Sequence, residues 1–200
     1  MSAEAAAEKP VVWSWRADWM EPVRARPVPV AVVAVLVCGV LGWRVGVRAE
    51  LAAFLYLGLV GTALGFVDAA LRRLPDPLTL TSYPVGLVLL GAAVPFTEAG
   101  GQRYVGALVG MAVLWVFFAV QWFMLPNALG LGDVKLSGVL GLYLGWLGSG
   151  AWVLGVFAMF VTGGLYSIGL LVLRRAGRKE SIPFGPFMLL GAFVGIVAYA

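Results

Sequence analysis

The chain has 200 residues, of which 62% are hydrophobic, 27 are glycine and only 12% are charged. Charged residues make up roughly 25% of soluble proteins, so too little polar surface remains to cover a water-soluble globule. The mean hydropathy of +0.96 agrees with this. We therefore expect an all-α fold, a polytopic integral membrane helical bundle whose solvent is lipid.

The residue types that are missing exclude several kinds of chemistry. The chain contains no histidine, which excludes Ser-His-Asp and Cys-His hydrolases and H-E-x-x-H zinc proteases. Its single cysteine, Cys38, cannot form a disulfide framework or a cysteine-rich zinc site within one chain. We expect no metal and no cofactor. The net charge of +4 fits cationic cytoplasmic loops, and no basic stripe interleaved with aromatic residues indicates a nucleic-acid partner.

Along the chain, a polar segment of mixed charge precedes a long apolar region. Residues 1–26 are predicted to be a cytoplasmic tail, and residues 27–200 a transmembrane domain. The apolar region divides into seven segments: 27–45, 50–68, 79–96, 104–125, 134–147, 150–173 and 183–200. Most of them approach the ~20 residues that cross a bilayer, so we predict about seven transmembrane helices. Glycine and other small residues within them suit close helix contact.

The distribution of lysine and arginine predicts the orientation of these helices. With seven spans and a cytoplasmic N-terminus, 11 of the 14 basic residues lie on the cytoplasmic side. Arg44, Arg48 and Arg103 lie in outer loops. The positive-inside rule therefore favours an N-terminus inside and a C-terminus outside.

The ten acidic residues fall into two groups. Asp68 ends the second segment, Asp76 follows in the next turn, and Asp133 opens the fifth segment. Asp68 and Asp133 are expected at the same depth, at the cytoplasmic membrane face. The other acids are expected to be solvated charges of the tail and loops: Glu4, Glu8, Asp18, Glu21, Glu50, Glu98 and Glu180.

Two carboxyl groups at one depth in a protein without histidine suggest an aspartyl dyad. An ionised carboxylate takes a proton from water while its protonated partner polarises the scissile carbonyl. Position alone leaves another interpretation open, in which each acid caps a helix or pairs with Arg72, Arg73 or Lys135.

The residues around both acids favour the dyad. Gly130 and Gly132 precede Asp133, and glycine allows another chain to approach closely. A Gly-x-Gly-Asp start to a span can thus place a carboxylate beside an extended substrate. The Leu-Pro-Asp-Pro cluster at 74–77 ends the helix that carries Asp68 and forms a rigid turn.

Three segments resemble motifs of the type IV prepilin peptidases. Residues 68–79, DAALRRLPDPLT, resemble the "D…R-[IL]-P-[ND]-x-L-T" segment of that family. Residues 130–136, GLGDVKL, resemble its "G-x-G-D-[VI]-K-L" motif, and residues 182–187, IPFGPF, are similar to its "[IV]-P-[FY]-G-P" segment. The motifs stand in the family order, and the resemblance spans about residues 55–200.

The resemblance implies an integral-membrane aspartyl endopeptidase that removes short basic leaders from prepilins, usually after glycine, at the cytoplasmic membrane face. It implies that Asp68 and Asp133 are the catalytic pair, and that prepilins or pseudopilins and the lipid bilayer are the partners. For Asp76 we expect a structural or leader-binding contact, whereas Lys135 could tune the dyad or meet lipid phosphates. The supporting residues carried over from the motifs are Gly130, Gly132, Lys135, Pro75, Asp76, Thr79, Pro183, Gly185 and Pro186.

The chain departs from the family in one respect. Many members also methylate the new N-terminus, and those members carry a cytoplasmic insertion with paired Cys-x-x-Cys motifs. Here only Cys38 is present, and no polar insertion of that size occurs. We therefore expect cleavage without methylation.

Other functions fit part of the pattern. A Ser–Lys protease of Lys135 and Ser137 is disfavoured, because residues i and i+2 of a helix do not face each other. Presenilin-like proteases share Gly-Leu-Gly-Asp, but they carry a Tyr-Asp pair and a Pro-Ala-Leu motif, whereas Val67 precedes Asp68 here. A small ion-coupled transporter would carry its acids deep in the spans. A non-catalytic assembly protein is disfavoured because both acids are present.

Overall fold

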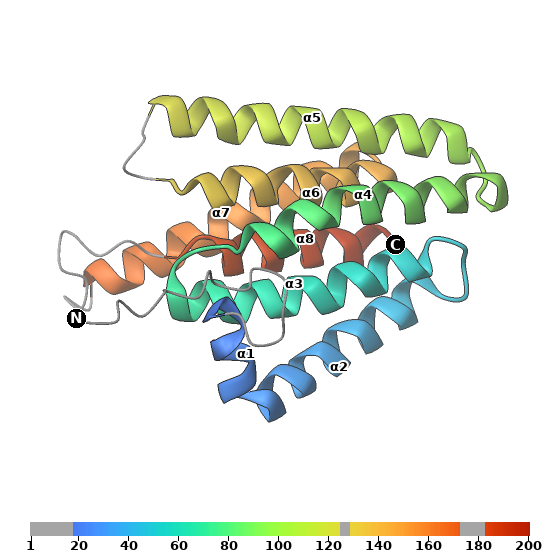
Figure 1. Cartoon of the computed structure of the whole chain (residues 1–200). Coiled ribbons are helices and arrows are strands. Elements are labelled where there is room, and N and C mark those ends of the chain that lie inside the picture. Colours follow the sequence, from blue (N-terminus) through green and yellow to red (C-terminus); the bar gives the residue numbers. More distant parts are fainter. Residues whose placement is uncertain (1–17, 125–128, 173–182) are drawn as a thin grey trace, which may run out of the picture.

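The computed structural model describes residues 18–124, 129–172 and 183–200, which form a bundle of helices (Figure 1). No strand occurs among these residues, so the all-α fold class is confirmed. The helices are η1 (Asp18–Met20), α1 (Glu21–Ala25), α2 (Pro27–Val45), α3 (Leu51–Leu71), α4 (Asp76–Ala93), η2 (Val94–Phe96), α5 (Gly100–Met124), α6 (Leu131–Leu147), α7 (Ser149–Val172) and α8 (Gly185–Tyr199).

The seven long helices correspond to the seven apolar segments, with ends that differ by a few residues. Five stretches are long and apolar enough to cross a membrane, namely α2, α3, α4 together with η2, α5 and α7. Helix α6 has 17 residues and α8 has 15, fewer than the ~20 that span a bilayer unaided. The count of seven spans therefore stays a prediction.

Successive long helices run in opposite directions, so the bundle has two ends (Figure 1). The α3–α4 turn and the starts of α6 and α8 lie at one end, which we call the α3–α4 end. The α2–α3 loop, η2 and the C-terminus lie at the other, the α2–α3 end. This alternation brings segments that are distant in the sequence to the same end.

Helix α6 forms the centre of the bundle. Residues 136–146 are all buried, and the helix contacts α4, α5, α7 and α8. Its backbone touches that of α5, because a Cβ on Gly110 would lie 2.5 Å from the carbonyl oxygen of Gly141. A Cβ on Gly106 would lie 2.8 Å from the carbonyl oxygen of Gly145. Close contact through glycine is therefore confirmed for this helix pair.

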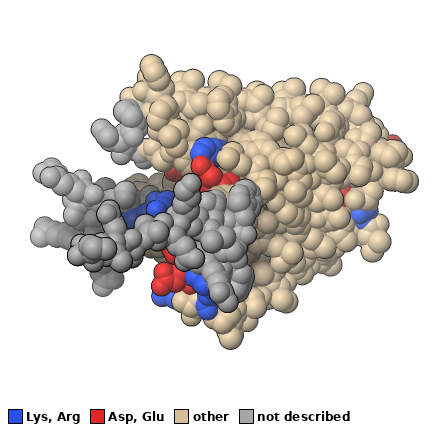
Figure 2. All heavy atoms as spheres, in the orientation of Figure 1, with Lys and Arg blue, Asp and Glu red and all other residues tan. Residues whose placement is uncertain are grey.

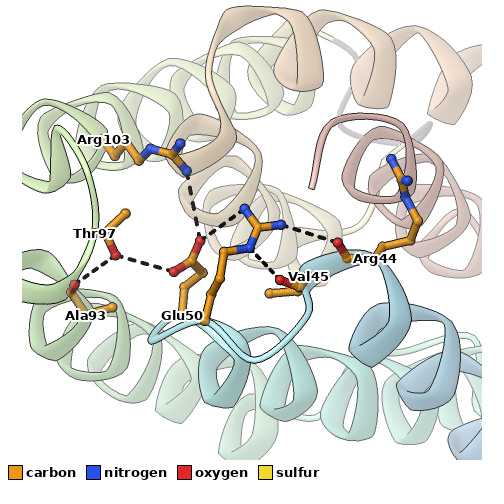
Figure 3. Close-up of polar contacts among 7 residues, drawn as sticks. Arg44, Val45, Glu50, Ala93, Thr97 and Arg103 are labelled. Carbon is orange, nitrogen blue, oxygen red and sulfur yellow. Dashed lines mark hydrogen bonds and ion pairs between the residues drawn. The ribbon is translucent and has the colours of Figure 1, made fainter.

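The prediction that Glu50 is a solvated loop charge is wrong. The residue is only 1% exposed, and its Oε1 lies 3.7 Å from a guanidinium nitrogen of Arg48 and 3.9 Å from one of Arg103 (Figure 3). The hydroxyl of Thr97 donates a hydrogen bond of 3.3 Å to Oε2. Glu50 is thus a buried acid that joins the α2–α3 loop to the α4–α5 connection. The sequence could not reveal this, because two of the three partners, Thr97 and Arg103, lie about 50 positions further along the chain.

The end of the predicted tail is ordered structure. Residues 18–25 form η1 and α1, α1 contacts α3, and Val23 is buried. These residues therefore pack on the domain rather than preceding it. Several predictions lie outside the described residues: those for residues 1–17, including Glu4 and Glu8, for the basic residues at 174, 175, 178 and 179, and for Glu180 and Ile182.

Candidate active site

Asp68 lies on the last turn of α3 and is only 4% exposed. Its Oδ2 accepts a hydrogen bond of 3.0 Å from the backbone N–H of Gly185, the first residue of α8. The helix ends at Arg72, whose φ of 53° lies in the left-handed region and whose N–H donates to the carbonyl of Asp68. Left-handed backbone costs a non-glycine residue roughly 1–2 kcal/mol, so this helix end is imposed by the tertiary structure.

The Leu-Pro-Asp-Pro cluster forms the predicted turn. Pro75 is the extended residue before α4, and Pro77 stands in the first turn of that helix, where a missing N–H costs nothing. The buried hydroxyl of Thr79 donates to the carbonyl of Pro75 at 3.1 Å. Pro75 and Thr79 therefore shape the turn that follows Asp68.

Asp133 lies in the first turn of α6 and is half-buried. Its Oδ2 accepts a hydrogen bond of 3.2 Å from the N–H of Gly130, the residue that precedes the helix. The capping interpretation is thus correct for one oxygen of Asp133. A Cβ on Gly132 would lie only 3.0 Å from Cβ of Leu74, so this glycine lets α6 approach the α3–α4 turn.

The two carboxyl groups lie at the same end of the bundle, Asp68 in the last turn of α3 and Asp133 in the first turn of α6. Figure 2 shows most of the visible charged side chains of the described residues beside the grey atoms, a smaller set at the opposite end, and an almost uncharged stretch between them. Neither acid forms an ion pair with any described residue. Pairing with Arg72, Arg73 or Lys135 is therefore not observed.

Lys135 binds Asp76 instead. The Nζ atom of Lys135 lies 2.7 Å from Oδ1 of Asp76, and both side chains are partly exposed. This ion pair joins the start of α4 to the first turn of α6. The hydroxyl of Tyr83 adds a second link, because it donates to the carbonyl of Lys135 at 2.6 Å.

The Ser–Lys alternative has no support in the geometry. Ser137 is fully buried, and its hydroxyl donates to the carbonyl of Val134 at 2.7 Å, within its own helix. Lys135 is engaged by Asp76. The transporter alternative required acids deep in the spans, whereas Asp68 stands in the last turn of α3 and Asp133 in the first turn of α6.

The third motif reaches the site through its backbone. Pro183 is half-buried and precedes α8, Gly185 is the first residue of the helix, and Pro186 is the second. The motif resemblance named these residues without a role, and the structure shows that Gly185 contacts Asp68 directly. Phe184 lies within the quoted IPFGPF motif but received no role from the sequence, and Tyr83 was missed. Tyr83 lies outside the quoted motifs, and its fit against Gly138 is a tertiary contact that carries no sequence signal.

An apolar cavity of about 410 Å³ lies beside Asp68, between α2, α3 and α8. Ala69 and Pro186 line it next to the site, and Leu41 and Ile196 line its far part. Its wall consists almost wholly of hydrophobic residues and glycine.

Metal ligands are not clustered in the described part of the chain. No group of three or more His, Cys, Asp or Glu side chains there is placed to hold an ion. Two carboxyl groups at the same end of the bundle fit an aspartyl dyad instead, in which a shared proton lets one group act as a base and the other as an acid.

The comparisons with known proteins fit this geometry. The sequence profile described as the type IV leader peptidase family matches residues 54–168, more than half of the chain. This chain belongs to that family. The matched residues contain both Asp68 and Asp133, whereas Gly185 lies beyond them.

Members of the type IV leader peptidase family in several bacteria are similar to the chain. It is 34% identical over 148 residues to the prepilin leader peptidase/N-methyltransferase of Aeromonas salmonicida, which covers 72% of this chain and 48% of that protein. The enzyme of the same description from Dickeya chrysanthemi is 33% identical over 81% of the chain and 55% of its own length. That from Pseudomonas putida is 29% identical over 84% of the chain and 57% of its own length. The chain thus spans about half the length of the curated relatives it matches. No solved structure matches it.

Proposed function

We propose that this chain is a membrane aspartyl endopeptidase that removes the basic leader peptide from type IV prepilins or pilin-like proteins. The observation that carries the proposal is the placement of Asp68 and Asp133 at the same end of the bundle, each with one oxygen held by a backbone N–H. The profile match to the type IV leader peptidase family, which contains both acids, supports the same activity.

The proposed reaction uses the two acids in different protonation states. The ionised carboxylate takes a proton from a water molecule, whose oxygen attacks the scissile carbonyl carbon. The protonated carboxyl polarises the carbonyl oxygen and then supplies the proton that the leaving amine needs. The peptide bond is thus hydrolysed to a carboxylic acid and an amine without any cofactor.

The proposed location is the cytoplasmic membrane, with the active site at its cytoplasmic face and the N-terminus inside. The distribution of basic residues along the sequence is the support for that orientation. Arg72, Arg73 and Lys135 belong to the α3–α4 end together with the two acids, whereas Arg44, Arg48 and Arg103 belong to the α2–α3 end. In the topology expected from the sequence, 11 of the 14 basic residues fall on the side of the loop between residues 71 and 76, and this excess fits the cytoplasmic side.

We further propose that the chain cleaves its substrate without methylating the new N-terminus. The curated relatives are described as both peptidase and N-methyltransferase. The 200 residues of this chain contain one cysteine, Cys38, which lies in the apolar helix α2 rather than in a polar insertion.

Co-expression with candidate prepilins encoded in the same genome tests both proposals. Loss of the leader on a gel, and a product mass that corresponds to a free N-terminal amine, are the expected results. If every candidate prepilin stays intact, and vesicles that contain the protein show proton-coupled solute uptake, the transporter is favoured instead. A methylated amine in the reconstituted reaction would contradict the second proposal alone.

A further inference from the structure

We propose that the start of α8 is a third part of the active site, in which Gly185 is a positioning residue that acts through its backbone N–H. Gly185 holds Oδ2 of Asp68, and this leaves Oδ1 as the oxygen that does the chemistry. The inference rests on the proposed peptidase function.

Asp68 needs such a donor because of its place in α3. A carboxylate in the last turn of a helix faces the negative end of the helix dipole, which disfavours its ionised form. The residue is 4% exposed, so water offers little compensation. No cation of the described residues pairs with Asp68, and the side-chain hydrogen bond that the structure gives it comes from Gly185.

The first turn of α8 offers one free N–H to Asp68. Pro186 has no N–H, and the N–H groups of Phe187 and Met188 both donate to the carbonyl of Phe184 at 3.1 Å. The N–H of Gly185 remains, and it points at Asp68 from the positive end of the α8 dipole. The negative end of α3 and the positive end of α8 thus meet at one carboxylate.

Only glycine allows this contact. A Cβ on residue 185 would lie 2.6 Å from Oδ2 of Asp68 and 3.1 Å from its Cγ. Contacts under 3.0 Å require one of the groups to move, and the group that would move here is the carboxyl group itself.

Aromatic packing fixes the position of Gly185 along the axis of the bundle. The ring of Phe184 lies 6.2 Å from that of Phe118 in α5 and 5.8 Å from that of Phe160 in α7. Gly163 makes room for it, because a Cβ there would lie 2.7 Å from the Phe184 ring. Phe184 therefore anchors the residue before the donor to two other helices.

The two acids are held in the same way. Oδ2 of Asp133 accepts from Gly130, and Oδ2 of Asp68 accepts from Gly185. Among the described residues, no hydrogen bond reaches Oδ1 of either acid. Each Oδ2 already accepts from an N–H group, so a proton on Oδ2 would compete with that donor. The shared proton and the attacking water therefore face the two Oδ1 atoms.

The test uses a purified wild-type enzyme and a prepilin that it cleaves. Gly185→Ala should lower kcat about 10- to 100-fold with KM within about twofold, since the substrate still binds but Asp68 is displaced. Gly164→Ala is the matched control, because a Cβ at residue 164 meets no atom within 4 Å. It should keep wild-type kcat and KM.

A backbone ester separates the hydrogen bond from the bulk of a side chain. Replacing Gly185 by its α-hydroxy analogue removes the N–H and adds no atom, and it should also lower kcat at least about tenfold. The same change at Phe187 removes an N–H that serves only the Phe184 carbonyl, so it should lower Tm and leave kcat unchanged.

A wild-type kcat in the folded ester variant at residue 185 overturns the inference, even if Gly185→Ala is inactive or unfolded. It leaves the proposed function standing. If the wild-type enzyme cleaves no prepilin, the proposed function fails instead, and the two failures are therefore distinct.

Discussion

Asp68 and Asp133 each have one oxygen tied to the backbone N–H of a glycine and one that no described residue holds. A backbone N–H has a fixed position and forms a strong hydrogen bond with a carboxylate. A carboxylate bound in this way keeps its orientation better than a solvated one does. At the scale of single residues, the orientation of both carboxyl groups therefore depends on Gly130 and Gly185, whose N–H groups bind them.

Removal of either acid should abolish cleavage. Asp68→Asn and Asp133→Asn keep the side-chain volume but remove the proton chemistry, so each should lower kcat by at least about 10³-fold. The double variant should be no worse than the single ones, because the pair acts as a unit. Cleavage of a prepilin by purified protein measures this, and near wild-type cleavage by Asp133→Asn would refute the aspartyl mechanism.

Asp76→Asn is the acidic control for that experiment. Its ion pair with Lys135 is partly exposed, and such pairs contribute about 0–1 kcal/mol to stability. The variant should keep at least part of the activity and nearly all of its thermal stability. Complete loss of cleavage with normal folding would instead give Asp76 a role in the reaction or in leader binding.

At the scale of helices, α6 depends on glycine for its place in the centre of the bundle. Its backbone touches that of α5, which leaves no room for side chains between Gly110 and Gly141. The position of α6 also sets the position of Asp133, because that acid stands in its first turn.

Gly110→Val should therefore disrupt the α5–α6 contact. Its Cβ would meet the carbonyl oxygen of Gly141 at 2.5 Å, and backbone cannot yield as a flexible side chain does. We expect a loss of about 1–3 kcal/mol or more in stability and a clear fall in Tm in detergent. Gly169→Ala, where a Cβ meets nothing within 4 Å, should leave Tm within about a degree of wild type, as its predicted cost is near zero. Equal Tm values for all three proteins would contradict the close packing.

At the scale of the whole molecule, the two ends of the bundle carry different polar groups. The α3–α4 end holds the two acids of the site. The α2–α3 end holds Glu50 with Arg48, Arg103 and Thr97 (Figure 3). The length of the bundle separates them, so changes at one end should act on stability and changes at the other on chemistry.

Glu50→Gln should destabilise the protein without altering the reaction. The change removes the buried negative charge that faces two arginines and keeps the side-chain volume, and the arginines are themselves partly exposed and can regain water. We therefore expect a modest loss of about 1–3 kcal/mol. Tm should fall, and kcat of the folded fraction should equal that of wild type. A large fall in kcat with unchanged Tm would contradict this separation.

The orientation of the whole bundle predicts which residues a membrane-impermeant reagent can reach. In a Cys38→Ala background, Phe96→Cys at the exposed end of η2 should react with such a maleimide in intact cells. Arg73→Cys in the α3–α4 turn should react only after the membrane has been permeabilised. Labelling of Arg73→Cys from outside would reverse the proposed topology.

The sequence by itself determined the fold class and the order of the long helices, and it led to the proposal of Asp68 and Asp133 as the catalytic pair. Apolar segments near the length of a membrane span are a local property, and so are the prolines at 75 and 77 that end α3 and start α4. Histidine was absent, so the choice of catalytic groups was narrow, and the motif resemblance pointed to Asp68 and Asp133.

The tertiary structure alone decided which partners each polar group has. Gly185 meets Asp68 across 117 positions of sequence, Lys135 meets Asp76 across 59, and Glu50 is buried against Arg103 and Thr97. None of these contacts follows from periodicity or composition, since helix packing selects which faces meet only after all helices are in place. A charged residue in a loop, such as Glu50, is therefore predicted from sequence to be solvated, and only the fold brings distant partners such as Arg103 and Thr97 to it.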